Sequence, residues 1–173
     1  MRSNNLSVHL LSHGEVEALR KVAQKVWPAT FKDILSPAQI TYMMEMMYSR
    51  KALLEQQESG CKLFISRKNL KNIGFISLEH DKDGSGKTKV HKIYVLEEMQ
   101  GTGAGRFLMN HAFAEARKHK ATAVFLNVNR YNKAIDFYEY YGFKKMYTED
   151  IDIGNGYLME DWVMEKPLTA PNP

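Results

Sequence analysis

Apolar and polar positions repeat with two different periods along this chain. In roughly the first third, apolar side chains recur every three or four positions, which is typical of helices that bury one face. From Cys61 onward, runs rich in β-branched and aromatic residues alternate with polar turns, which is typical of strands. The pattern predicts a helical N-terminal part, followed by a sheet with further helices.

Local signals give the bounds of the first elements. Leu6–Leu11 is a short apolar run that predicts a strand. Ser12 followed by Glu15 is a capping-box pattern, so a helix should begin there, and we expect it to end at Trp27-Pro28. Two more helical segments are expected, one that starts at Ser36-Pro37 and another at Arg50–Glu58.

The rest of the chain predicts an antiparallel meander, a parallel crossover and a closing hairpin at Asn155-Gly156. The expected strands are Lys62–Arg67, Asn72–His80, Lys87–Leu96, Ala123–Val128, Phe143–Ile151 and Tyr157–Glu165. The expected helices between them are Phe107–Lys120 and Tyr131–Tyr141. The fold class is therefore α/β in the mixed sense. We expect one domain over residues 1–166, and residues 167–173 as a loose tail.

Composition narrows the class of protein. The chain has 173 residues, of which 44% are hydrophobic and 25% charged, as in globular proteins. No apolar run approaches the ~20 residues of a membrane span, and Cys61 is the single cysteine, so we expect a cytoplasmic protein. The net charge of +4 is mild and no dense Lys/Arg block occurs, so neither nucleic acid nor membrane is an expected partner.

A glycine-rich turn stands between a strand-like and a helix-like run. Gln100–Arg106 reads Gln-Gly-Thr-Gly-Ala-Gly-Arg. Backbone N–H groups at such a turn and helix start form a cradle for phosphate. The dinucleotide-binding and P-loop patterns that start at Gly101 both fail, because Arg106 stands where each requires glycine.

The turn resembles another phosphate-binding pattern. Gln100-x-x-Gly103-x-Gly105 is similar to the Q/R-x-x-G-x-G/A pattern of the GNAT superfamily of N-acetyltransferases. A second resemblance to that family follows at Leu126, Val128, Asn132, Ala134, Tyr138 and Gly142-Phe143. The resemblance covers Ile73–Phe143 best. It implies the GNAT fold, a central mixed, mostly antiparallel sheet of about seven strands flanked by helices, and an acyltransferase that uses acetyl-CoA.

The resemblance also implies how the co-substrate acetyl-CoA is held. The glycine turn would bind its pyrophosphate, and a splayed strand would offer backbone groups to the pantetheine arm and one N–H to the acetyl carbonyl. Asn132 would contact the arm, although it is also a good helix cap. The implied cofactor-binding residues are Ile93, Tyr94, Val95, Gln100, Gly101, Thr102, Gly103, Ala104, Gly105, Arg106 and Asn132.

Acetyl transfer to an amine needs an acid and a base. Tyr138 is the candidate general acid for the leaving thiolate because of its register before Gly142, with Tyr141 as the alternative. Glu79 is the candidate general base, acting through a water. Other candidates for that role are Glu97, Glu98, His80 and His91. No metal is expected, because the sequence shows no Cys/His cluster.

The acceptor is the least defined part. Val26–Ser49 resembles a segment of bacterial spermidine/spermine acetyltransferases of the Pai type, with Phe31 in place of a tyrosine. A polyamine acceptor would need carboxylates, and those available are Glu45, Glu79, Glu139, Glu149 and Asp150. The alternatives are a protein N-terminus or lysine as acceptor, and a non-catalytic sensor of coenzyme A or acyl-CoA. The oligomeric state stays open, a homodimer being one option.

Overall fold

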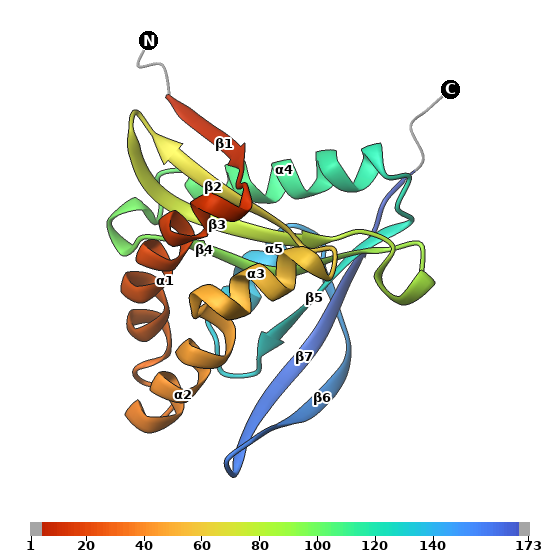
Figure 1. The fold of residues 1–173 in the computed structure, drawn as a ribbon. Coiled ribbons are helices and arrows are strands. Elements are labelled where there is room, and N and C mark those ends of the chain that lie inside the picture. The colour runs from red at the N-terminus through yellow and green to blue at the C-terminus, as the bar shows by residue number, and fades with distance from the viewer. Residues whose placement is uncertain (1–4, 170–173) are drawn as a thin grey trace.

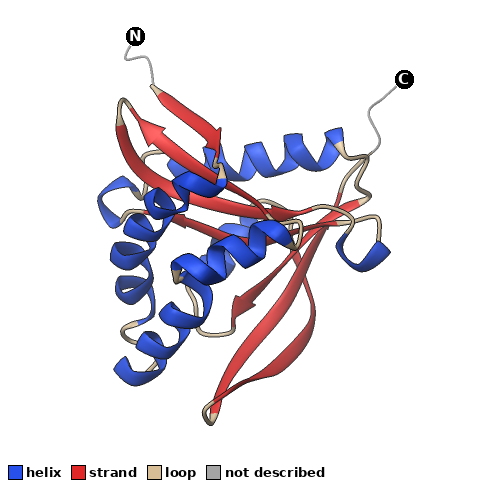
Figure 2. Cartoon of the chain, viewed as in Figure 1, coloured by secondary structure: helices blue, strands red, loops and turns tan. Residues whose placement is uncertain are grey.

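A single seven-stranded sheet organises the protein. The structure is a computed structural model that describes residues 5–169. The strand order is β1-β2-β3-β4-β5-β7-β6, and within that range β4–β5 is the one parallel pair (Figure 2). The strands are β1 (Leu6–Leu10), β2 (Lys62–Lys68), β3 (Lys71–Glu79), β4 (Thr88–Val95), β5 (Ala123–Asn129), β6 (Lys144–Gly154) and β7 (Tyr157–Pro167). The predicted mixed, mostly antiparallel sheet is confirmed.

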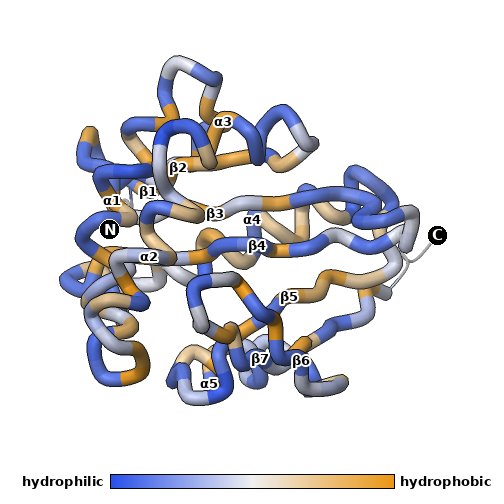
Figure 3. The backbone as a smooth tube through the Cα atoms, turned by 60° about the horizontal axis from the view of Figure 1, so that its bottom comes forward, coloured by the Kyte–Doolittle hydropathy of each residue, from blue (hydrophilic) through white to orange (hydrophobic). Residues whose placement is uncertain are grey.

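Helices cover both faces of the sheet. They are α1 (Val16–Phe31), α2 (Pro37–Tyr48), α3 (Arg50–Glu58), α4 (Ala104–Lys118) and α5 (Ala134–Tyr140). Figure 1 shows α1, α2 and α3 on one face and α4 and α5 on the other, and each set packs on its own buried hydrophobic cluster. Hydrophobic segments run along β2 and β5 (Figure 3). No helix within residues 5–169 is long and apolar enough to cross a membrane.

The first helix does not end at Trp27-Pro28 as expected. It continues to Phe31, with Pro28 inside it. The rings of Trp27 and Phe31 are both buried, and their centroids lie 4.3 Å apart. Burial of these two aromatic side chains offsets the backbone hydrogen bond that Pro28 cannot make. The Lys32 N–H then donates to the Pro28 carbonyl at 3.0 Å.

Other helix and strand boundaries differ by a few residues from those that the sequence predicts. The expected helix at Tyr131 begins only at Ala134, whose N–H donates to Asn132 Oδ1 at 2.9 Å. The predicted hairpin turn is confirmed, since Asn155 and Gly156 both have positive φ. Strand β7 runs to Pro167. Of the expected tail, residues 170–173 lie outside the described residues.

The parallel pair β4–β5 is short. Only Thr88–Val90 pairs with Val124–Leu126. Against β3, the register shifts between Ser77 and Leu78, so His91 is an extra residue on β4. A bulge bends and twists its strand. Beyond it β4 keeps its pairing with β3 and separates from β5, and the two strands diverge in Figure 1.

We predict that Gly74→Ala lowers the free energy of unfolding by about 1–3 kcal/mol, the usual cost of overpacking. A Cβ at Gly74 would lie 2.6 Å from the Tyr94 carbonyl oxygen and 2.9 Å from Ser66 Oγ. Urea denaturation measures the change. Gly14→Ala is the control, because a Cβ there meets nothing within 4 Å. Equal stability of the two variants would contradict this packing.

Candidate active site

A large cleft occupies the gap where β4 leaves β5. Its volume is about 1450 Å³, and its walls come from β4, β5, the start of α4, α5 and the α1–α2 region. Most of the site residues predicted from sequence line it: Ile93, Tyr94, Val95, Gln100, Gly101, Gly103, Gly105, Arg106, Asn132 and Tyr138. Thr102, Ala104 and Glu79 are not among the lining residues. One opening in the sheet therefore brings together segments that are distant in sequence.

The glycine turn lies at one end of the cleft. Gly101 and Gly103 have φ of +74° and +90°, a conformation that favours glycine, and α4 begins directly after them. The N–H groups of Gln100 and Thr102 donate to the carbonyls of Glu97 and Met99, just before the turn. Within residues 5–169 we find no backbone acceptor for the N–H groups of Gly103, Ala104, Gly105 and Arg106. These donors at the positive end of α4 suit a phosphate.

Two side chains from α5 and its preceding turn face the same cleft. Tyr138 is 7% exposed and lines the cleft. Burial, with a smaller effect of nearby Tyr94, raises the pKa of the Tyr138 hydroxyl, so this group keeps its proton at neutral pH. Asn132 lines the cleft while its Oδ1 caps the start of α5. The alternative Tyr141 also lines the cleft, but its hydroxyl accepts from Arg106 Nε at 3.2 Å.

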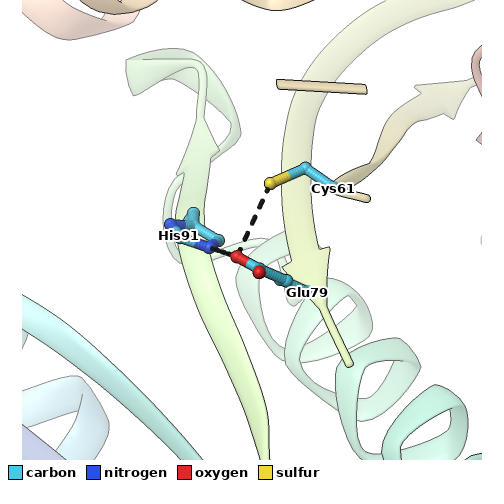
Figure 4. A group of neighbouring side chains, drawn as sticks. All are labelled: Cys61, Glu79 and His91. Carbon is cyan, nitrogen blue, oxygen red and sulfur yellow. Dashed lines mark hydrogen bonds and ion pairs between the residues drawn. The ribbon is translucent and has the colours of Figure 1, made fainter. Parts of the chain in front are cut away.

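Glu79 has neighbours of its own. Its carboxylate accepts from His91 Nε2 at 2.7 Å and is 3.9 Å from Cys61 Sγ (Figure 4). It also lies 3.3 Å from Lys82 Nζ. His91 lines the cleft, so Glu79 reaches the cleft through the imidazole. Burial lowers the pKa of His91 to about 4, with Lys89 and Lys92 adding to the effect against the hydrogen bond to Glu79. His91 is therefore neutral at pH 7.

The structure also brings together potential metal ligands that sequence spacing did not reveal. The ligand atoms of Cys61, Glu79 and His91 lie within 4.8 Å of one another. The ammonium of Lys82 already pairs with Glu79, and Lys89 and Lys92 oppose further positive charge near His91. We therefore describe the group as a hydrogen-bonded chain and assign no metal to it.

The other end of the cleft is apolar and is closed by two distant segments. The Tyr42 hydroxyl on α2 donates to the Ile153 carbonyl at 2.6 Å, and Gln39 Nε2 donates to the Leu158 carbonyl at 3.0 Å. These bonds dock α2 onto the β6–β7 hairpin. The apolar residues that line this end include Trp27, Phe31, Ile34, Leu35, Met43, Met47 and Met159. Such a wall fits an aliphatic chain.

Carboxylates line the cleft at positions that sequence reasoning missed. None of the five carboxylates considered for a polyamine is among the lining residues. Glu97 and Glu98, which the sequence offered as alternative bases, do line the cleft, and so do Asp33 and Asp161. Asp161 on β7 is 3% exposed. A signal for it exists in the sequence, because Met159 and Val163, two positions away on either side, share its face of the strand. An acid between apolar neighbours at strand spacing is a buried acid, which sequence reasoning could have noted.

Comparison with known proteins gives the family. Residues 19–165 match the family model described as "Acetyltransferase (GNAT) domain". An uncharacterized N-acetyltransferase of Mycobacterium bovis is 26% identical over 156 residues, covering 89% of this chain and 98% of the relative. The PaiA N-acetyltransferase of Thermoplasma acidophilum, solved in complex with coenzyme A, is 26% identical with a TM-score of 0.78, covering 94% of this chain and 99% of that one.

A more distant structure shares the fold. The ribosomal-protein-S18-alanine N-acetyltransferase of Escherichia coli has a TM-score of 0.72 at 20% identity, covering 96% of each chain. The match of the family model to most of the chain shows that this protein belongs to the GNAT acetyltransferase family. It is an acetyl-CoA-dependent N-acetyltransferase.

Buried Lys92 generates a prediction about stability. Its Nζ donates to Gln56 Oε1 at 2.7 Å, and burial lowers the pKa of Lys92 from 10.5 to about 8. Below pH 8 the folded state bears the full cost of this charge. As pH rises toward 10.5 that cost disappears, because the folded protein releases the proton before the unfolded chain does.

We therefore expect the free energy of unfolding of Lys92→Met, relative to that of the parent, to be highest below pH 8. This advantage should shrink by up to about 1.4 kcal/mol per pH unit above pH 8. Urea unfolding at pH 7, 8, 9 and 9.5 measures it, with Lys62→Met at an exposed position as the control. A difference that does not vary with pH would show that Lys92 titrates normally.

Proposed function

We propose that this enzyme transfers the acetyl group of acetyl-CoA to a primary amine by direct attack in a ternary complex, and that a polyamine such as spermidine or spermine is the favoured acceptor. The observation that carries the proposal is the β4–β5 cleft. It has phosphate-binding geometry at the glycine turn and an apolar, carboxylate-bearing wall at the other end. Two ligands can therefore meet at its middle.

In this proposal the predicted cofactor residues divide into three groups. The turn Gln100–Arg106 receives the pyrophosphate through backbone N–H groups, with the Arg106 guanidinium beside it. Ile93–Val95 on β4 offer the backbone groups that β5 leaves unpaired, and one N–H polarises the acetyl carbonyl. Asn132 contacts the pantetheine arm with the polar atoms that its capping role leaves free. The PaiA N-acetyltransferase of Thermoplasma acidophilum, which is 26% identical, was solved in complex with coenzyme A, and this supports coenzyme A as the ligand class.

Tyr138 is the proposed general acid. A group that protonates a departing thiolate must carry a proton at neutral pH. A tyrosine hydroxyl does so, and burial, which raises the pKa of Tyr138, favours the protonated form further. Tyr141 fits less well, since its hydroxyl is engaged by Arg106. Glu79 as proton acceptor stays a prediction, and its carboxylate, which does not line the cleft, would act through its hydrogen bond with His91.

The acceptor class follows from the shape and charge of the far wall. An alkyl chain would lie against the apolar side chains of α1 and α2, and methionines there adapt to different chain lengths. Asp33 and Asp161 offer carboxylates to the terminal ammonium groups. A cytoplasmic location, the absence of a nucleic-acid partner and a homodimer stay predictions.

The direct test is thiol release from acetyl-CoA with a panel of spermidine, spermine, putrescine, amino acids, aminoglycosides and short peptides. We expect saturable release with a polyamine. Release with peptides alone would instead assign a protein acceptor. If no compound of the panel causes thiol release while acetyl-CoA still binds, the result points to a protein acceptor or a cofactor sensor and overturns the proposed polyamine acceptor.

We predict that Tyr138→Phe lowers kcat by about 10²-fold or more, the usual contribution of a general acid. Binding of acetyl-CoA, measured by calorimetry, should stay within about twofold, because the ring remains in place. Tyr147→Phe is the matched control, since that tyrosine lies on β6 at 58% exposure, away from the cleft lining. Full activity of Tyr138→Phe would remove the hydroxyl from the mechanism.

A further inference from the structure

The buried carboxylate of Asp161 has one oxygen without a hydrogen-bond partner among the described residues. Its side chain comes from β7, is 3% exposed and lines the cleft. Among residues 5–169, its Oδ2 has no hydrogen-bond partner. Asn127 is a hydrogen-bond partner of this carboxylate, but burial of a charged group whose other oxygen is unpaired is still costly, so proteins pair such groups or use them. A group with this geometry indicates a ligand that brings a positive charge and N–H donors.

The charged neighbours of Asp161 increase this need. In the β6–β7 register Glu149 lies directly opposite Asp161, and like charges at such positions repel. Glu149 accepts from Asn127 Nδ2 at 2.8 Å. The nearby cations are Lys89 on β4, whose Nζ lies 5.7 Å from the centroid of the Phe125 ring, and Arg130, which pairs with Asp150 and Glu160. No ion pair to Asp161 forms in the described residues.

Neighbouring groups act on the pKa of Asp161 in both directions. Burial, with a smaller contribution from Glu149, raises the pKa of Asp161 to about 6, although the hydrogen bond from Asn127 and the charges of Lys89 and Arg130 act in the opposite direction. At pH 7 the group is mostly ionised and can still hold a proton during a reaction. His91 also lines the cleft, but its low pKa makes it a weak proton acceptor.

We propose that Asp161 binds the ammonium group of the acceptor and accepts the proton that this group must lose before it attacks. The inference rests on the proposed N-acetyltransferase function and deepens it. It assigns the deprotonation to a cleft-lining carboxylate on β7, in place of Glu79, which does not line the cleft. The ligand class is an aliphatic primary ammonium, with its chain against the apolar wall.

The proton balance closes with the residues at hand. Asp161 takes one proton from the ammonium, and the neutral amine forms the new C–N bond at the acetyl carbonyl. The C–S bond then breaks, and Tyr138 gives its proton to the departing sulfur. The amide nitrogen loses a second proton, which restores the Tyr138 hydroxyl. Asp161 finally releases its proton to water, so the net products are the amide, the free thiol and one proton.

The test is Asp161→Asn, which keeps the shape and removes the charge. We expect kcat/KM for spermidine to fall at least 100-fold, with acetyl-CoA affinity within twofold of the parent. In the parent, kcat/KM should rise with pH through an apparent pKa near 6. This rise of kcat/KM with pH should be absent in Asp161→Asn and should return in part in Asp161→Glu. Glu45→Gln, a carboxylate outside the cleft lining, should behave as the parent does.

Two outcomes separate this inference from the proposed function. The parent can acetylate spermidine while Asp161→Asn keeps the parent's rate and the parent's rise of kcat/KM near pH 6. In that case the inference is overturned and the proposed function stands. If the parent is inactive, calorimetry of spermidine binding to the complex with coenzyme A decides. Loss of binding in Asp161→Asn supports the ammonium site although the function fails, and unchanged binding overturns both.

Discussion

The short parallel contact between β4 and β5 is the constraint on which the rest of the structure depends. Three residue pairs join the two strands, and the extra residue His91 then turns β4 away. Backbone N–H and C=O groups on the open edge of β4 lose their strand partner. This open edge can pair with a ligand that carries amide-like groups, as the proposed binding of acetyl-CoA requires.

The elements around the opening divide its tasks. Helix α4 presents its N-terminal N–H groups at one end, while α2 and the β6–β7 hairpin close the other end through Tyr42 and Gln39. Tyr138 from α5 and Asp161 from β7 also line the cleft. Both are buried and both keep a proton more readily than an exposed counterpart would. The packing of these elements around the cleft therefore gives the site its shape, and the burial of Tyr138 and Asp161 gives it its acid–base properties.

Sequence patterns predicted the architecture well and the acceptor side poorly. The glycine turn, the capping box at Ser12 and the hairpin at Asn155-Gly156 are local signals, and the structure confirms them. Pro28 misled the prediction because burial of Trp27 and Phe31 outweighs a local breaker. The burial of Asp161 could be read from its apolar neighbours at strand spacing, but its place in the cleft and the grouping of Cys61, Glu79 and His91 depend on contacts between distant segments. Such contacts follow from tertiary structure, which spacing along the chain does not encode.

The central claim is that acetyl-CoA binds along the open edge of β4. Amide hydrogen exchange, with and without acetyl-CoA, tests it most directly. The account predicts that N–H groups of residues 92–95 that point away from β3, together with those of Gly103–Arg106, exchange more slowly in the complex, while the N–H groups shared by β2 and β3 do not change. Protection that leaves residues 92–95 unaffected, despite saturating acetyl-CoA, would contradict the account.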